Sequence, residues 1–226
     1  FPTLGTIPIA LRFTASPNRS TTYFGDTRIH RIHFNKIRRS INSDGEKSER
    51  LLEVCAMPTR LANKWILITG ASSGIGEALA RGLSGKARRL LLVARSRARL
   101  DAIGADIAGA EAVGCDLALA TDRQALAAML VDQRVDVLVN NAGVGLFGAF
   151  SNADPPRIAE LLEINLLAVV QLTRALLPRL IAQRAGAIVN ITSNAGLQGC
   201  PYMSVYAGAK SFLINWTEGL AGELRG

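Results

Sequence analysis

A tyrosine and a lysine stand four residues apart in the stretch SVYAGAKSF (204–212). Residues at i and i+4 share one face of a helix, so the phenol of Tyr206 and the ammonium of Lys210 can meet there. The Ala, Gly and Ala between them leave space for a ligand beside the pair. These residue types predict a general acid whose acidity the ammonium increases.

Such a pair works only in a shielded site. A tyrosine side chain has an ordinary pKa of about 10, so an acid that acts near pH 7 needs roughly 4 kcal/mol of anion stabilisation. An ammonium about 4 Å away supplies roughly 4 kcal/mol at an effective dielectric constant of 20, but only about 1 kcal/mol in bulk water.

Five apolar runs, each followed by a helical pattern, must position this pair. The runs are WILIT, RLLLVA, EAVGC, VDVLVN and AIVNITS, and the helical patterns cover 74–84, about 96–109, 121–132, about 155–183 and about 204–224. Alternating strands and helices with right-handed crossovers form a parallel sheet covered on both faces. The expected fold class is α/β, a doubly wound parallel sheet of the Rossmann type.

The helical pattern at 155–183 is apolar enough to raise the question of a membrane span. Glu163, Asn165, Gln171, Arg174 and Pro178 interrupt it, which favours a buried or subunit-facing amphipathic helix with a kink at the proline. No apolar run approaches the roughly 18 residues of a span, so we expect no transmembrane helix.

A glycine-rich turn, TGASSGIG (69–76), joins the first strand to the first helix. Gly70 permits a tight turn, Gly74 lets a pyrophosphate approach the backbone, and Gly76 lets the helix pack on the strand. The helix N-terminus offers free N–H groups to a phosphate. No Gly-Lys-Ser/Thr follows, so this is not a Walker A loop. Glycines that serve the geometry of the turn alone are the alternative.

Arg95 ends the second strand, about 20 residues after this turn, where a NAD-binding domain carries Asp or Glu for the ribose. A carboxylate would repel a 2′-phosphate, whereas an arginine pairs with one. Arg95 therefore favours NADP over NAD. The alternative is that Arg95, with Arg97 and Arg99, belongs to a solvated basic face.

Together these features resemble the short-chain dehydrogenase/reductase family. That family carries TGxxxGxG, an Asp after the third strand, NNAG after the fourth, an Asn in the next helix, a Ser after the fifth strand, and YxxxK. The matching positions, all beyond about residue 61, are Thr69 to Gly76, Asp116, NNAG at 140–143, Asn165, Ser193, Tyr206 and Lys210.

The resemblance implies an oxidoreductase that interconverts a carbonyl and an alcohol by hydride transfer, with NADP preferred to NAD as cofactor. Tyr206 would be the general acid/base, and Ser193 would donate a hydrogen bond to the carbonyl oxygen. Lys210 would also hold the nicotinamide ribose, and Asn165 would bind a water that relays protons. The residues expected to bind the cofactor are Gly70, Ser72, Ser73, Gly74, Ile75, Gly76, Arg95, Asp116, Leu117, Asn141, Ala142, Gly143, Tyr206 and Lys210.

Each residue taken singly also has a structural alternative. Asn140 and Asn141 can turn the chain, Ser193 can cap the next segment, and Tyr206 can be a surface aromatic. Their joint order favours the functional interpretation. A second functional hypothesis is a regulator or scaffold of the same fold that binds NADP without turnover, but such a protein needs no proton donor.

The substrate is expected to contact VGLFGAF (144–150) and NAGLQGCPYM (194–203), which follow the fourth and fifth strands. These segments are mostly apolar or small, which indicates a hydrophobic ketone with an acyl chain or a sterol-like ring. The resemblance also implies homodimers or homotetramers through the helices at 155–183 and 204–224.

The net charge of +8 does not indicate a nucleic-acid partner. The basic excess is densest in residues 1–56, which carry no aromatic or glycine-rich RNA-binding motif. The cysteines, Cys55, Cys115 and Cys200, are too few and too far apart for a disulfide framework or a zinc site. We therefore expect no metal and a cytoplasmic location.

Two parts of different character make up the chain. Residues 1–56 show no sustained period and are expected to be an extension outside the family, disordered or not native. Residues 57–226 are expected to form a partial Rossmann domain that binds cofactor and carries catalysis. Met57 is the first methionine and the native protein is hypothesised to start there; the rival is an organelle transit peptide, suggested by RFTASPNRSTTYF and opposed by five acidic residues before position 54.

The family usually continues past the YxxxK helix with another strand and further helical structure, whereas this chain stops at LAGELRG (220–226). The resemblance therefore implies a C-terminally incomplete domain. The strand AIVNITS is expected to present an unpaired edge and an uncovered apolar face. We expect little activity from the 226-residue chain, and the parent protein to be the enzyme.

Overall fold

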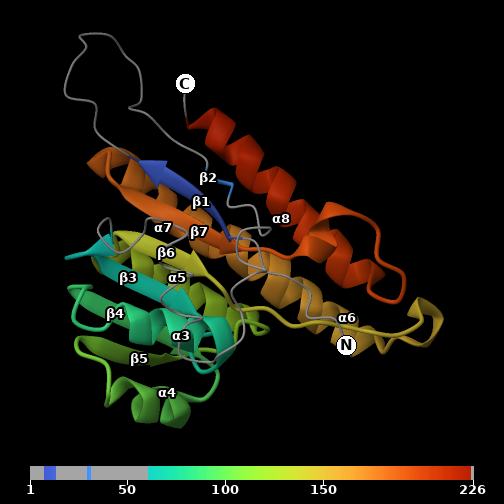
Figure 1. Cartoon of the computed structure of the whole chain (residues 1–226), viewed down its shortest axis with the longest axis horizontal. Coiled ribbons are helices and arrows are strands. Elements are labelled where there is room, and N and C mark those ends of the chain that lie inside the picture. The colour runs from blue at the N-terminus through green and yellow to red at the C-terminus, as the bar shows by residue number, and fades with distance from the viewer. Residues whose placement is uncertain (1–7, 14–29, 32–60, 225–226) are drawn as a thin grey trace, which may run out of the picture.

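A computed structural model describes residues 8–13, 30–31 and 61–224 of the chain (Figure 1). Within these residues one sheet has the strand order β2-β1-β7-β6-β3-β4-β5. Its parallel part consists of β3 (Trp65–Thr69), β4 (Arg89–Ala94), β5 (Ala110–Gly114), β6 (Val137–Asn140) and β7 (Gly186–Ile191). The chain builds outward from β3 to β5, then crosses back to β6 on the other side of β3. The predicted doubly wound fold is confirmed.

Helices cover both faces of this sheet. The helices α3 (Gly74–Gly82) and α4 (Arg97–Gly104) pack on one face, and α5 (Ala120–Asp132), α7 (Ala168–Gln183) and the end of α8 (Ser204–Glu223) pack on the other. Alternate side chains of one strand enter opposite cores, as Ile66 and Leu67 do on β3. Strands buried on both faces read as continuous apolar runs, which is why the sequence predicts them well.

The helical region at 155–183 has three parts. It begins with α6 (Pro155–Leu162), continues through one π-helical turn (Glu163–Leu167) and ends with α7, which contains Pro178. Among the described residues this is the one helix long and apolar enough to cross a membrane, and 44% of its most apolar window is buried inside the molecule. The buried side chains include Leu172, Leu176 and Leu180, which pack on the sheet as in a core helix.

The outer edge of β7 is paired, contrary to the prediction of an open edge. The strand β1 (Pro8–Phe13) lies antiparallel along it, from Pro8 opposite Ile191 to Phe13 opposite Gly186, and β2 (His30–Arg31) pairs with β1. Because β1 and β7 are far apart in the sequence, no local sequence pattern predicts their pairing. The other predictions about residues 1–56 fall mainly outside the described residues.

Candidate active site

The carboxyl ends of β3 and β6 are joined by a compact set of hydrogen bonds. Thr69 Oγ1 accepts from the backbone N–H groups of Asn141 and Ala142, each at 3.0 Å. Asn141 Nδ2 in turn donates to Thr69 O at 2.9 Å and Gly70 O at 3.2 Å. The NNAG segment therefore locks the glycine turn against the end of β6. In doubly wound sheets a ligand crevice opens at such a reversal of strand order.

The glycine turn has the shape of a phosphate cradle. Gly70 (φ 66°) and Gly74 (φ 57°) occupy the left-handed region, and a Cβ at Gly70 would lie 2.8 Å from Ala142 Cα. A Cβ at Gly74 would meet no atom within 4 Å, so space is open before the N-terminus of α3. The N-cap residue Ser73 makes no side-chain capping bond there. The residues present fit a dinucleotide, whose pyrophosphate such a helix end attracts.

Gly76 is required for a different reason. A Cβ at this position would lie 2.3 Å from Gly70 O and 2.6 Å from Asn141 Nδ2. We expect Gly76→Ala to lower the free energy of unfolding by about 3 kcal/mol, since a backbone atom cannot yield. Gly74→Ala, strained but unobstructed, should cost only about 1 kcal/mol. Urea denaturation of both variants is the measurement, and equal losses would contradict this account of the turn.

Lys210 lies buried at the carboxyl end of β7. Its Nζ donates to Ile191 O at 3.0 Å and stands 5.8 Å from the centroid of the Tyr206 ring. Burial lowers the pKa of the Lys210 ammonium from 10.5 to about 8, because a charge is poorly solvated there. The predicted pair thus lies together, with Tyr206 half-buried and its lysine partner shielded from water.

Asn165 lies within reach of the same ammonium. Its Nδ2 donates to Val144 O at 2.8 Å and Leu161 O at 2.9 Å, while its buried Oδ1 accepts no hydrogen bond from any described residue. A Cβ at Gly143 would lie 2.7 Å from Asn165 Oδ1 and 3.4 Å from Lys210 Nζ. A buried acceptor normally has a partner, so this arrangement suits a water between the amide and the ammonium.

Ser193 begins the short 3-10 helix Asn194–Leu197, and its Oγ accepts from Ala195 N at 3.2 Å. This is the capping role named as its structural alternative. The oxygen accepts in this bond, so the hydroxyl proton can still be donated to a substrate oxygen. The 3-10 helix packs against α8, since a Cβ at Gly196 would lie 2.7 Å from the carbonyl carbon of Lys210.

The predicted residues of the adenosine side lie on the loops after β4 and β5. Arg95 is largely exposed and its Nη1 lies 3.5 Å from Glu160 Oε1, a carboxylate on α6. Asp116 Oδ1 accepts from Ala118 N at 3.0 Å, and Leu117 is buried. The exposed Arg95 thus has a half-buried acidic neighbour, and the Asp116 carboxylate shapes its own loop.

The two loops expected to contact substrate meet each other. The rings of Phe147 and Tyr202 have centroids 6.2 Å apart, and Gly148 N donates to Tyr202 O at 2.8 Å. Both rings are exposed, as are Phe150 and Leu197 on the same loops. The surface that these two loops form is therefore apolar and aromatic.

Two groups near the site were not among the predicted residues. Thr69, whose hydroxyl joins the two strand ends, is the first residue of the glycine motif, but the sequence predicted no role for it. Arg123 is 3% exposed and lies 2.5 Å from Glu163 at the π-helical turn. The sequence does contain a signal for the burial of Arg123, because its spacing from Leu126 and Leu130 places all three on the same buried face of α5.

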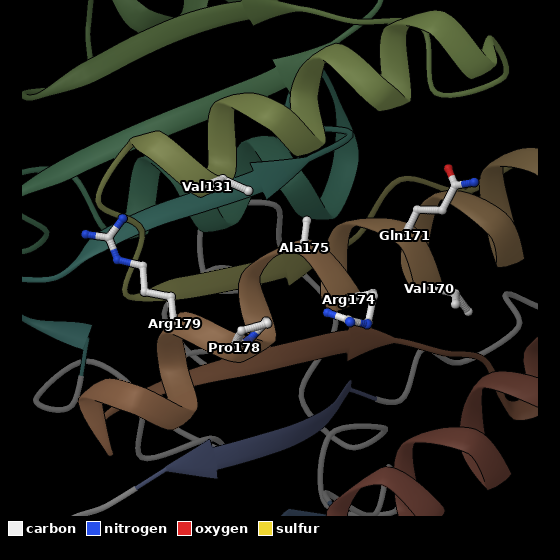
Figure 2. Close-up of a pocket in the computed structure, with 7 residues that line it drawn as sticks. All are labelled: Val131, Val170, Gln171, Arg174, Ala175, Pro178 and Arg179. Atoms are coloured by element: carbon white, nitrogen blue, oxygen red, sulfur yellow. The ribbon is translucent and has the colours of Figure 1, made fainter.

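A groove of about 650 Å³ lies apart from these residues, between α5 and α7 (Figure 2). Its lining combines apolar side chains with polar ones: Val131, Val170, Gln171, Arg174, Ala175, Pro178 and Arg179. It contains none of the predicted catalytic residues, so the chemistry is assigned to the strand ends and not to this groove.

Known proteins resemble the chain over the same region. The family model described as short chain dehydrogenase matches residues 64–226. The ketoacyl reductase HetN of a Nostoc species is 38% identical over 174 residues, which are 74% of this chain and 61% of that protein. A very-long-chain 3-oxoacyl-CoA reductase of Pyrenophora tritici-repentis is 30% identical over 171 residues, 71% of this chain and 50% of that protein.

A solved structure agrees with these sequence matches. The short-chain dehydrogenase from Sphingobium yanoikuyae in complex with NADPH superimposes with a TM-score of 0.69 at 36% identity, over 71% of this chain and 66% of that chain. The chain spans between half and two thirds of the length of these three proteins.

Proposed function

Because the chain belongs to the short-chain dehydrogenase family, we propose that it forms part of an NADP-preferring oxidoreductase that interconverts a carbonyl and an alcohol by hydride transfer. The observation that carries the proposal is the pairing of Tyr206 with a buried Lys210 at the carboxyl edge of the sheet. A protein that only bound NADP could use Lys210 to hold the ribose, but it would need no proton donor beside that lysine, and burial of the ammonium is costly.

The side chains divide the proton chemistry among them. Tyr206 gives its proton to the carbonyl oxygen during reduction and takes one back during oxidation. Ser193 donates a hydrogen bond to the same oxygen, where negative charge develops. The Lys210 ammonium stabilises the phenolate that Tyr206 becomes, at low local dielectric. Asn165 Oδ1 holds a water that restores the proton through Lys210. NADPH supplies the hydride when bound.

Residues from four strand ends would hold this cofactor. The glycine turn, with Ser72, Ser73 and Ile75, would receive the pyrophosphate at the start of α3. Asp116 and Leu117 would border the adenine, and the segment Asn141–Gly143 would lie along the middle of the cofactor. Arg95 would pair with the 2′-phosphate, exchanging its exposed contact with Glu160 for a doubly charged partner.

Removing Arg95 tests this cofactor preference. We expect Arg95→Ser to weaken NADPH binding about tenfold or more and to leave NADH binding within about twofold, since only the former loses a charge-assisted hydrogen bond. Fluorescence titration of the chain with each nucleotide gives both constants. Arg97→Ser is the matched control, because Arg97 pairs with Asp101 on α4. Equal losses for both nucleotides, or the same loss in the control, would refute the assignment.

The substrate we propose is a hydrophobic ketone, and an acyl chain with a 3-oxo group is the form that fits best. The exposed rings of Phe147 and Tyr202 and the neighbouring Leu197 offer apolar contacts beside α8. Two relatives are named as reductases of ketoacyl or 3-oxoacyl compounds. Comparing the turnover of ketones of increasing chain length by the full-length protein would test this, and a preference for small polar ketones would exclude it.

The proposed assembly is a homodimer or homotetramer through α7 and α8. Exposed apolar side chains at the start of the helical region 155–183 and on α8 support it: Leu162 on α6, Leu167 on the π-helical turn, and Phe212, whose ring stacks on Trp216 with centroids 6.2 Å apart. Sedimentation equilibrium of the full-length protein is the check, and a monomer at micromolar concentration would oppose the proposal.

A further inference from the structure

An ion pair between the buried Arg123 and the partly exposed Glu163 lies beside the π-helical turn and has no part in the chemistry proposed above. Arg123 Nη2 on α5 lies 2.5 Å from Glu163 Oε2. The same guanidinium donates from Nη1 to Leu117 O at 2.8 Å and from Nε to Gln171 Oε1 at 3.0 Å. Arg123 therefore joins α5, the loop after β5 and both sides of the turn, since Glu163 begins the turn and Gln171 lies in the first turn of α7.

The π-helical turn is what aims Asn165. Ala168 N donates to Glu163 O, five residues earlier, so the turn holds one residue more than an α-helical turn. Asn165 Nδ2 bonds to Leu161 O, the acceptor that the Asn165 N–H would use in a regular α-helix. Single π-helical turns inside a helix are rare, so contacts from outside the helix can decide whether this one persists.

Arg123 is in position to do so. The planar fork of an arginine fixes several acceptors at once, and its contacts at Glu163 and Gln171 lie on the two sides of Asn165. Without the fork, the turn can relax to α-helix, which rotates the residues on one side by one position, about 100°. That rotation would carry the Asn165 amide away from Gly143 and Lys210.

We propose that Arg123 is a positioning residue that holds the π-helical turn and thereby keeps the Asn165 amide facing Lys210. The inference rests on the proposed function only for the part that Asn165 plays in proton transfer. The geometry of the turn is independent of any reaction, so it can be tested in the chain without turnover.

The direct readout is the side-chain amide of Asn165 in ¹H–¹⁵N spectra, assigned by its disappearance in Asn165→Asp. In Arg123→Met we expect these signals to shift and their protons to exchange with solvent about tenfold faster or more. The matched control is Arg179→Met. Arg179 on α7 also donates to a backbone oxygen at the end of α5, Gln133 O at 2.5 Å, but far along the helix from the turn. Its removal should leave the Asn165 signals unchanged.

A second variant protects the test against misfolding. Glu163→Gln keeps the volume and leaves two bonds of Arg123 intact, and it should shift the Asn165 amide in the same direction by a smaller amount. Unchanged Asn165 signals in folded Arg123→Met and Glu163→Gln would overturn the proposal. An equal change of the Asn165 signals in Arg179→Met would also overturn the proposal, because any weakened contact between α5 and α7 would then produce the effect.

Turnover by the full-length protein provides a second, separate readout. Arg123→Met should lower kcat about tenfold with the KM for the ketone within about twofold, and adding Asn165→Ala should cause little further loss, because both changes disable one unit. If instead the fold losses in kcat of the two single variants multiply in the double variant, Arg123 does not act through Asn165. Absence of turnover in the unmodified protein would count against the proposed function alone, and the amide signals would still decide the inference.

Discussion

Tyr206→Phe is expected to lower kcat for NADPH-dependent ketone reduction by about 10³-fold, the range lost when a general acid is removed. The substitution takes away one oxygen and leaves the ring that stands 5.8 Å from Lys210 Nζ. Affinity for NADPH should fall by less than about tenfold, the worth of one hydrogen bond. Steady-state kinetics of the full-length protein and fluorescence titration of the same sample give the two quantities.

Tyr202→Phe is the matched control for this change. Tyr202 lies four residues earlier, is exposed, and meets Phe147 through its ring and Gly148 through its backbone. Its hydroxyl has no role in the proposed chemistry, so kcat should stay within about twofold. Comparable losses in the two variants, or full activity in Tyr206→Phe, would remove the tyrosine from the role of general acid.

Lys210→Met is expected to stabilise the fold while it disables the site. The folded chain buries an ammonium whose pKa is lowered from 10.5 to about 8, a difference equivalent to about 3 kcal/mol. Loss of the hydrogen bond to Ile191 O destabilises the fold by about 1 kcal/mol. The free energy of unfolding at pH 7 should therefore rise by about 2 kcal/mol in total. The gain reflects a lysine kept for function at the expense of stability.

The pH dependence gives this prediction its sign. Below pH 8 both states carry the proton and the folded state bears the full cost of the buried charge. Between pH 8 and 10.5 the unfolded chain keeps a proton that the folded chain has lost, so the stability of the unmodified chain rises with pH across that window. The advantage of Lys210→Met should therefore shrink above pH 8 and reverse to a deficit of about 1 kcal/mol, the lost hydrogen bond to Ile191 O, as the pH approaches 10.5.

Urea denaturation at several pH values between 7 and 10.5 measures this trend. Lys86→Met is the control, because Lys86 is exposed in the turn before β4, and its difference from the unmodified chain should not vary with pH. A Lys210→Met chain that is less stable at pH 7, or a difference that stays constant with pH, would mean that the ammonium is not buried at a cost.

Much of the fold follows from local patterns. The five apolar runs became β3 to β7 within about two residues, because strands buried on both faces need continuous apolar sequence. The helix after β6 was expected as one continuous element, but a π-helical turn interrupts it. The apolar spacing of this helix gives no sign that the turn contains an extra residue. The contact proposed to hold the turn comes from Arg123, which lies on another helix, α5.

The sequence predicted which candidate residues lie near one another better than it predicted their burial and contacts. Spacing alone placed Tyr206 beside Lys210, and the family motifs named Asn165 and Gly143, which the structure brings to the same ammonium. The burial of Lys210 was not readable from its neighbours in sequence, because β7 and the 3-10 helix after it provide the cover. The same holds for Arg95, whose contact with Glu160 joins residues 65 positions apart.

The measurement that tests the central claim most directly is the transfer of deuterium from NADPH that carries deuterium at both C4 positions to a hydrophobic 3-oxoacyl substrate, using the full-length protein. The account predicts an alcohol that carries one deuterium on the former carbonyl carbon, formed by the unmodified protein and at about 10³-fold lower rate by Tyr206→Phe. Tight NADPH binding with no labelled alcohol from any ketone tried would contradict it, and would identify the chain as a nucleotide-binding protein that keeps the fold without the reaction.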